Sequence, residues 1–350
     1  MMTNSKRLRN SSIELLRLYS MLMIVGFHYV ISGPDMQYLI ESPVSFTKFV
    51  YQFIYMGGGW AGNFVFFTIS VWFLLDQNLS LRDSLRRVWL LERELLFWSI
   101  VLMAILVIAQ HEGLYHEGVF WLLPKTVLPL LTNMWWYPTS YALFLLLRPF
   151  ISHGLQKIGY RNHKALAICV LLLWGALAMV PFPVMQLDLS KNSVFVFFYW
   201  LILLSYCKWY LNITYKNATV LIISGLVVEL VYWATATTFY MMTGKKPEFQ
   251  NFIFDHWTLP TMMIGFGLFI LCYRHPFRNR FVNYLAASSL GVYLIHYHPG
   301  VYRMWTGWFP LRGVKHVNPS NTARCNHHLE CVLGMPRIRF DSTDALQADN

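Results

Sequence analysis

The sequence predicts an all-α fold, a polytopic transmembrane helical bundle of about nine spans. Two properties of the composition indicate this class. Hydrophobic residues make up 56% of the 350 residues and charged residues only 13%, about half of their share in a typical soluble domain. Apolar residues also occur in runs of about eighteen or more, which is long enough to cross a hydrocarbon layer about 30 Å thick. A soluble domain of this length would need a polar surface that the composition does not supply.

The predicted spans follow the apolar runs in chain order. The first run contains Glu14 and Arg17 and lacks a small-residue cleavage site, so we interpret it as a retained span and not as a signal peptide. The apolar stretch 119–131 is short and broken by prolines, which is typical of an interfacial or re-entrant segment. The predicted spans lie near residues 12–32, 57–75, 94–110, 133–151, 164–183, 193–211, 217–240, 258–273 and 285–303.

Lysine and arginine are distributed unevenly between alternate loops. One set of loops holds about fifteen of them and the other about five, and positive residues are retained on the cytoplasmic side. The sequence therefore predicts a multi-pass protein of the cytoplasmic membrane, in contact with lipids, whose N-terminus is cytoplasmic. The formal net charge of +11 does not indicate nucleic-acid binding, because the basic residues do not gather on one segment.

The first span carries two ionisable residues that are costly in lipid, roughly 2.5–3.5 kcal/mol each for a charge at the bilayer centre. Arg17 and His28 are eleven residues apart, so a helix places both on nearly the same face, about 16 Å apart along its axis. Arginine suits a phosphate or carboxylate. A neutral imidazole suits the removal of a proton from a hydroxyl group.

A structural interpretation explains the same two residues. Arg17 would pair with Glu14 one turn away and extend toward the membrane interface. His28 would only be hydrogen-bonded within the bundle. The residues of this span do not decide between the two interpretations.

The ninth span holds a second histidine. Ser289, Tyr293 and His296 follow one another at intervals of four and three residues, so they share a helical face that could line a polar cavity. In the second span, Asn63 and Ser70 share a face in the same way. The alternative for both faces is hydrogen bonding between packed spans, in which Ser, Tyr and His are common.

The densest cationic stretch precedes the third span and contains Arg82, Arg86, Arg87 and Arg93. Such a cluster could hold the phosphates of a nucleotide-containing donor at the cytoplasmic surface. Its alternative is an ordinary cytoplasmic loop, since the positive-inside rule alone produces the same composition.

From about Pro310 the composition changes to polar and charged residues, with no apolar run long enough to span a membrane. We predict a transmembrane domain at 1–303 and a polar, disordered tail at 304–350. The tail contains two cysteines, Cys325 and Cys331, with two histidines between them, but their spacing fits no standard zinc motif and a second ligand pair is missing. We therefore predict no metal site.

Five motifs occur in a fixed order along the chain. They are Ile13-Glu-Leu-Leu-Arg17 followed by His28, Phe66-Phe67-Thr-Ile-Ser70, Arg86-Arg87 with Arg93, Trp135-Trp136-Tyr137 leading to Pro149, and Ser288-Ser289-Leu-Gly-Val-Tyr-Leu-Ile-His296. In order and spacing they resemble the acyltransferase-3 family of membrane acyltransferases, over roughly residues 7–303. The chain departs from the family pattern at Val71, where the family has glycine, and in its polar tail, where the family core has a tenth span.

The resemblance implies an acyl-CoA donor on the cytoplasmic side, usually acetyl-CoA, and an acceptor hydroxyl on an outward-facing glycan or lipid-linked saccharide. No tightly bound cofactor is implied. His28 would act as the general base, and His296 with Tyr293 would position the acceptor or the thioester. Arg17 and the arginines 86, 87 and 93 would hold the CoA phosphates. Supporting residues would be Glu14, Ser70, Trp136 and Ser289.

The competing hypothesis is a non-enzymatic glycan transporter or flippase. In such a protein the same buried polar residues would line a path through the membrane. The two hypotheses differ in whether the protein transfers an acyl group from acyl-CoA.

Overall fold

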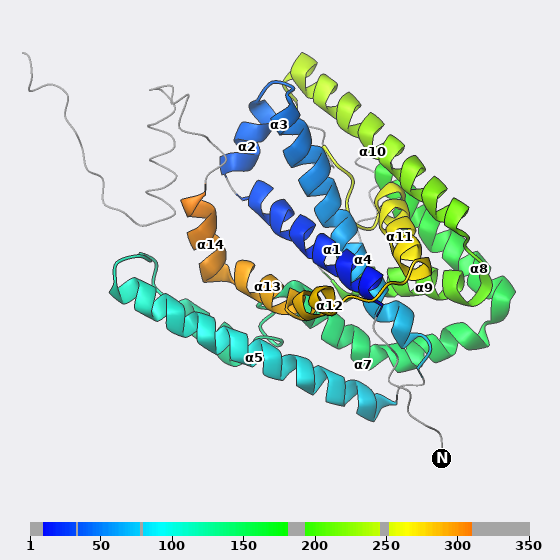
Figure 1. Ribbon diagram of the computed structural model, residues 1–350, viewed down its shortest axis with the longest axis horizontal. Helices are drawn as coiled ribbons and strands as arrows, with labels where there is room; N and C mark the ends of the chain where they lie inside the picture. The colour runs from blue at the N-terminus through cyan, green and yellow to red at the C-terminus, as the bar shows by residue number, and fades with distance from the viewer. Residues whose placement is uncertain (1–9, 33, 78–79, 181–192, 246–251, 310–350) are drawn as a thin grey trace, which may run out of the picture.

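The computed structural model describes residues 10–32, 34–77, 80–180, 193–245 and 252–309 (Figure 1). These residues are 81% helical and contain no strand, which confirms the predicted all-α class. Three helices of this part are long and apolar enough to cross a membrane, Ser11–Val30, Gly159–Met179 and Tyr215–Thr243, and two shorter apolar helices are Val194–Tyr210 and Leu259–Arg274. The predicted number of nine spans is therefore not confirmed.

Helix α1 (Ser11–Val30) runs through the middle of the molecule and packs along α4 (Gly57–Leu74) (Figure 1). The side chain of Asn10 caps α1 by accepting a hydrogen bond from the Ser12 N–H at 3.0 Å. Glycines of α4 face α1: a Cβ atom on Gly62 would lie 2.9 Å from the Ser20 carbonyl oxygen. The two backbones can approach this closely because glycine has no side chain.

The chain between α1 and α4 is helical for most of its length. It forms α2 (Pro34–Glu41), α3 (Phe46–Phe49) and a π-helical segment, η1 (Val50–Met56), that runs directly into α4. Lys48 is buried and donates hydrogen bonds to the carbonyls of Ile40 and Ser42, each at 2.9 Å. This lysine ties α3 to the C-terminal end of α2.

Helix α5 (Leu81–His111) begins thirteen residues before the span predicted at 94–110. Its start is a capping box, in which the Ser80 hydroxyl accepts from the Asp83 N–H and the Asp83 carboxylate accepts from the Ser80 N–H. The arginine-rich stretch is thus the first part of a helix. After α5, the proline-containing stretch at 119–131 forms a short 3-10 turn, η2 (Phe120–Leu122), and a short helix, α6 (Leu123–Val127).

The next five helical segments agree with the predicted positions to within a few residues. They are α7 (Trp136–Lys157), α8 (Gly159–Val170) continued by η3 (Leu171–Ala176) and η4 (Leu177–Met179), α9 (Val194–Tyr210), α10 (Tyr215–Thr243) and α11 (Leu259–Arg274).

Aromatic rings from α4, α7 and α9 form the largest core. The ring centroid of Phe67 lies 5.0 Å from that of Phe144 and 4.4 Å from that of Phe197.

The ninth predicted span, 285–303, is not one helix. It is divided among α12 (Arg280–Ala287), α13 (Ser289–His296) and α14 (Pro299–Trp308). The second break falls at Pro299, which lacks a backbone N–H and is favoured at the first position of a helix. The expectation of a continuous span was therefore wrong, and α14 extends past the predicted domain boundary at 303; the rest of the tail, from residue 310, lies outside the described residues.

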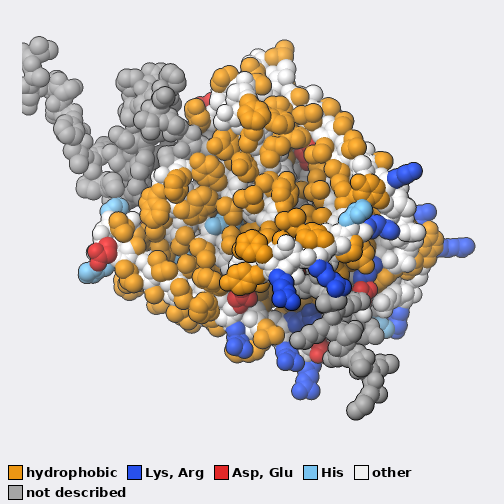
Figure 2. Space-filling model, in the orientation of Figure 1, with side chains coloured by type: hydrophobic (Ala, Val, Ile, Leu, Met, Phe, Trp, Pro, Cys, Tyr) orange, Lys and Arg blue, Asp and Glu red, His pale blue; other side chains and the backbone are white. Residues whose placement is uncertain are grey.

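The surface of the molecule is largely apolar, with Lys and Arg gathered toward one side of the face in Figure 2. Large hydrophobic side chains are exposed along α10, where Val220, Ile223, Val227 and Val231 repeat at helical spacing. A soluble protein would not expose such a continuous stripe. The surface is that of a helical protein surrounded by lipid.

Candidate functional site

Two buried histidines meet where α1 and α13 end. The Nδ1 atom of His28 lies 2.8 Å from the Nε2 atom of His296. The two residues are 5% and 8% exposed. Helix packing thus joins two of the residues that the sequence singled out separately, and it joins them by a direct hydrogen bond.

The hydrogen bonds around this histidine pair determine which nitrogen carries each proton. His296 Nδ1 lies 2.7 Å from the Val292 carbonyl oxygen, which only accepts, so His296 Nδ1 carries a proton. The Nε2 atom of neutral His296 is then an acceptor, and the Nδ1–H of His28 donates to it. His28 Nε2 consequently keeps its lone pair, and it has no hydrogen-bond partner among the described residues. This nitrogen can take up a proton from a substrate.

Aromatic residues on α14 and in the turn before it hold the histidine pair. The Tyr297 ring stacks on the His28 ring at 4.1 Å with an interplanar angle of 16°. The Tyr302 hydroxyl donates to the His28 carbonyl at 2.8 Å, and the Trp305 indole N–H donates to the His296 carbonyl at 2.9 Å. The break at Pro299 turns α14 back toward the histidines, so these contacts depend on it.

Arg17 lies on α1 and is paired with Glu14, with a distance of 2.7 Å between Nη1 and Oε2. The Arg17 side chain is 28% exposed and the Glu14 side chain 9%. The pair considered in the structural interpretation therefore exists. It does not remove Arg17 from the site, because a guanidinium group has five N–H donors and this contact uses one.

A column of tyrosine rings extends from the histidine pair through Tyr293 of α13 to Tyr137 and Tyr141 of α7. Ring centroids are 5.8 Å apart for Tyr293 and His296, 6.2 Å for Tyr137 and Tyr293, and 6.5 Å for Tyr137 and Tyr141. The hydroxyl groups of Tyr137 and Tyr293 are buried and have no hydrogen-bond partner within the described part of the chain. They can therefore bind a polar group of a substrate.

The arginines of the predicted phosphate site lie on the first turns of α5. Arg86 and Arg93 are exposed, while Arg87 is partly buried and donates to the side-chain oxygen of Gln77 at 2.7 Å. Hydrogen bonds from the hydroxyl and backbone N–H of Ser80 hold the pKa of Asp83 below its usual range. That carboxylate remains ionised beside the arginines.

The remaining predicted residues lie away from the contact between the two histidines. The hydroxyl of Ser70 donates to the Phe66 carbonyl at 3.2 Å and also lies within hydrogen-bonding reach of Tyr141 on α7. The hydroxyl of Ser289 donates to the Ala286 carbonyl at 2.9 Å within its own helix. Trp136 stacks on His256 and does not contact the histidine pair. Its neighbour Trp135 supports α13 instead, because its indole N–H donates to the Leu294 carbonyl at 3.2 Å.

The sequence reasoning missed a second buried polar group, which involves Glu229 on α10. Its carboxylate accepts from the Thr261 hydroxyl at 2.6 Å. Nearby, His256 is completely buried among tryptophan rings and lies 3.3 Å from the Asp255 carboxylate. The available signal was Glu229 itself, an ionisable residue inside an apolar run.

The fold and this site define a helical membrane protein with a buried histidine pair and an arginine-rich edge. A family model described as an acyltransferase domain matches residues 10–323. The chain therefore belongs to the acyltransferase-3 family, and as a member of it the protein is a membrane acyltransferase. Comparisons with curated proteins and with solved structures gave no match.

Proposed function

We propose that the protein transfers an acyl group, in the simplest case acetyl, from cytoplasmic acyl-CoA to a hydroxyl group of an extracytoplasmic glycan or lipid-linked saccharide. The observation that carries the proposal is the free Nε2 lone pair of His28, imposed by the hydrogen bonds from Val292 through His296. An imidazole oriented in this way by a second group is the arrangement that a general base requires.

The proposed reaction is a direct transfer. His28 Nε2 removes the proton of the acceptor hydroxyl while the hydroxyl oxygen forms an ester bond to the acyl carbon. The carbon–sulfur bond of the thioester then breaks, and the proton on His28 passes to the departing sulfur, so that free CoA is released. During the step, the imidazolium of His28 is stabilised because its Nδ1–H donates to His296.

Three further groups support the same reaction. Arg17, with Arg86, Arg87 and Arg93, supplies positive charge for the CoA phosphates. Tyr293 lies beside His296, and Tyr137 lies beside Tyr293. In the proposed reaction their buried hydroxyls donate to the thioester carbonyl as negative charge develops on its oxygen. We place the arginines on the cytoplasmic side and the N-terminus with them, following the distribution of positive charge.

The test is transfer of radiolabelled acetyl groups from acetyl-CoA to cell-surface polysaccharide in membranes containing the protein. We expect label in the polysaccharide, and we expect His28→Ala to reduce it by about 10²-fold or more, as for loss of a general base. His111→Ala, at the exposed end of α5, is the matched control and retains activity. Transport of glycan without any label transfer from acetyl-CoA would support the transporter hypothesis instead.

A further inference from the structure

The proposed reaction places a positive charge on His28 at a buried position. His28 is 5% exposed, so water solvates little of the charge that its ring acquires with the proton. Within the described part of the chain, no carboxylate pairs with His28 or His296. Burying a charge without an opposite charge beside it is costly. The imidazolium form therefore needs stabilisation beyond the single hydrogen bond to His296.

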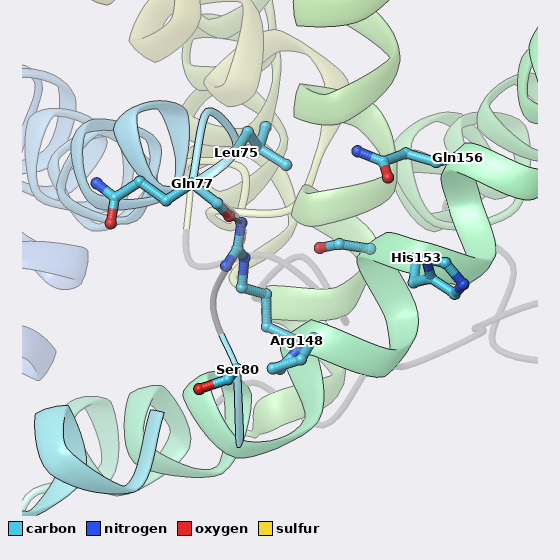
Figure 3. A pocket seen from close by; sticks show the side chains of 8 residues that line it. Leu75, Gln77, Ser80, Arg148, His153 and Gln156 are labelled. Atoms are coloured by element: carbon cyan, nitrogen blue, oxygen red, sulfur yellow. Dashed lines mark hydrogen bonds between the residues drawn. The ribbon is translucent and has the colours of Figure 1, made fainter. Parts of the chain in front are cut away.

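An open cavity of the molecule lies elsewhere and does not supply this stabilisation. The cavity has a volume of about 520 Å³ and lies where α4 ends and α5 begins, with Gln77, Arg148 and Gln156 among the residues that line it (Figure 3). In the described ranges, none of its lining residues hydrogen-bonds to His28 or stacks on its ring. The groups that act on the charge are therefore those in direct contact with the imidazole.

The ring of Tyr297 makes the closest ring contact with His28 among the described residues. The two ring centroids are 4.1 Å apart and the interplanar angle is 16°, so the π face of the phenol lies over the imidazole. Pairs of neutral aromatic rings prefer centroid distances of about 4.5–7 Å. A cation within about 6 Å of an aromatic face is attracted by the negative charge of that face. The contact is therefore more favourable for the imidazolium than for the neutral imidazole.

Tyr297 is held over His28 from both sides of the turn between α13 and α14. Its backbone N–H donates to the Tyr293 carbonyl at 3.2 Å. Its ring packs against the ring of Tyr302 at a centroid distance of 5.7 Å and an angle of 72°, and the Tyr302 hydroxyl is bonded to the His28 carbonyl. These contacts fix the tilt of the phenol ring over the imidazole.

Two consecutive residues thus act on different parts of the His28 ring. His296 accepts the hydrogen bond from Nδ1–H at the edge of the ring, whereas Tyr297 covers one of its faces. Neither contact uses Nε2, the atom that takes up the proton in the proposed reaction. The stacked phenol can therefore stabilise the charge while the reacting edge of the imidazole stays available.

We propose that the π face of Tyr297 stabilises the positive charge on His28 during acyl transfer. This proposal rests on the proposed function and deepens it. Tyr297 is a positioning residue, because it acts through His28 and not on the reacting atoms. Its attraction to His28 strengthens only when the imidazole takes up the proton, so it accelerates the chemical step and leaves the binding of acyl-CoA unchanged.

The test is the incorporation of fluorinated phenylalanines at position 297, because fluorine withdraws electrons from the ring face and changes the shape of the ring little. We expect Tyr297→Phe, which retains the face, to keep the turnover number within about threefold of wild type. Mono-, tri- and pentafluorinated phenylalanine should then lower the turnover number stepwise, by about tenfold or more in total, with an unchanged KM for acetyl-CoA. A role in packing alone predicts no such series.

Pentafluorophenylalanine in place of Tyr284, an exposed residue of α12, is the matched control and should retain wild-type turnover. Size-exclusion profiles show whether each variant is folded. A constant turnover number along the fluorinated series would overturn the role of Tyr297 and leave acyl transfer standing. A loss that is already complete in Tyr297→Phe would do the same, because it would assign the effect to the hydroxyl. Absence of acetyl transfer by wild type would overturn both proposals.

Discussion

The hydrogen bond between His28 and His296 joins residues 268 positions apart in the chain. Each histidine alone is a polar group in an apolar environment and costs free energy to bury. In the pair, the Nδ1–H of His28 donates to the Nε2 atom of His296, and the Nδ1–H of His296 donates to the Val292 carbonyl. The Nε2 atom of His28 keeps a lone pair that can accept a proton. In the proposed mechanism, His296 is a positioning residue that acts through His28.

This role predicts a difference between two substitutions of His296. Glutamine provides a carbonyl oxygen that can accept from His28 Nδ1–H, whereas alanine provides nothing. We expect His296→Ala to lower the turnover number for acetyl transfer about 10²-fold with an unchanged KM for acetyl-CoA, and His296→Gln to recover at least about a tenth of wild-type turnover. Equal losses in both variants would mean that His296 does not act by orienting His28.

Helices α1 and α4 depend on glycine for their approach, and α1 carries both Arg17 and His28. A Cβ atom on Gly59 would lie 2.2 Å from Phe27 Cβ, and one on Gly62 would lie 2.9 Å from a backbone oxygen. The backbone atom cannot rotate away as a flexible side chain can. The position of His28 is therefore sensitive to the size of the residue at position 62.

We expect Gly62→Ala to lower the free energy of unfolding by about 1–3 kcal/mol through overpacking, and to lower acetyl transfer by displacing α1. The matched control is Gly154→Ala on α7, where an added Cβ meets nothing within 4 Å. It should gain up to about 1 kcal/mol from helix propensity. Unfolding in detergent, followed by circular dichroism, measures both. Equal stability of the two variants would contradict close packing of α1 on α4.

At the scale of the whole molecule, charge and apolar surface are separated. Lys and Arg gather toward one side of the face in Figure 2, and apolar side chains cover most of the remainder. Arg17 and His28 lie toward opposite ends of α1, and the histidine pair is at the end that carries His28. Such a separation suits the proposed transfer across a membrane.

The orientation can be tested with single cysteines in a variant whose five native cysteines are replaced by serine. Thr243→Cys lies at the exposed end of α10 and Arg161→Cys on the exposed surface of α8. By the positive-inside rule, a membrane-impermeant maleimide should label position 243 in intact cells and position 161 only after permeabilisation. The opposite labelling would place the N-terminus outside.

What the sequence determined by itself was local. Apolar runs located α1, α4 and α7 to α11 to within a few residues, because hydrophobicity and helical period act over neighbouring positions. Arg17 and His28 stood out for the same reason, since an ionisable residue in an apolar run is visible without any knowledge of its neighbours in space. The start of α5 was misjudged because charged residues at a helix end resemble a loop in a hydropathy profile.

Only the tertiary structure decided which distant residues meet. It brought His296 to His28, placed Trp135 rather than Trp136 against α13, and converted the ninth predicted span into three helices with α14 folded back on the histidines. It also brought the buried Glu229 carboxylate to the Thr261 hydroxyl, a contact that no motif indicated. These contacts depend on the angles and distances at which helices pack, which residue spacing along one helix does not encode.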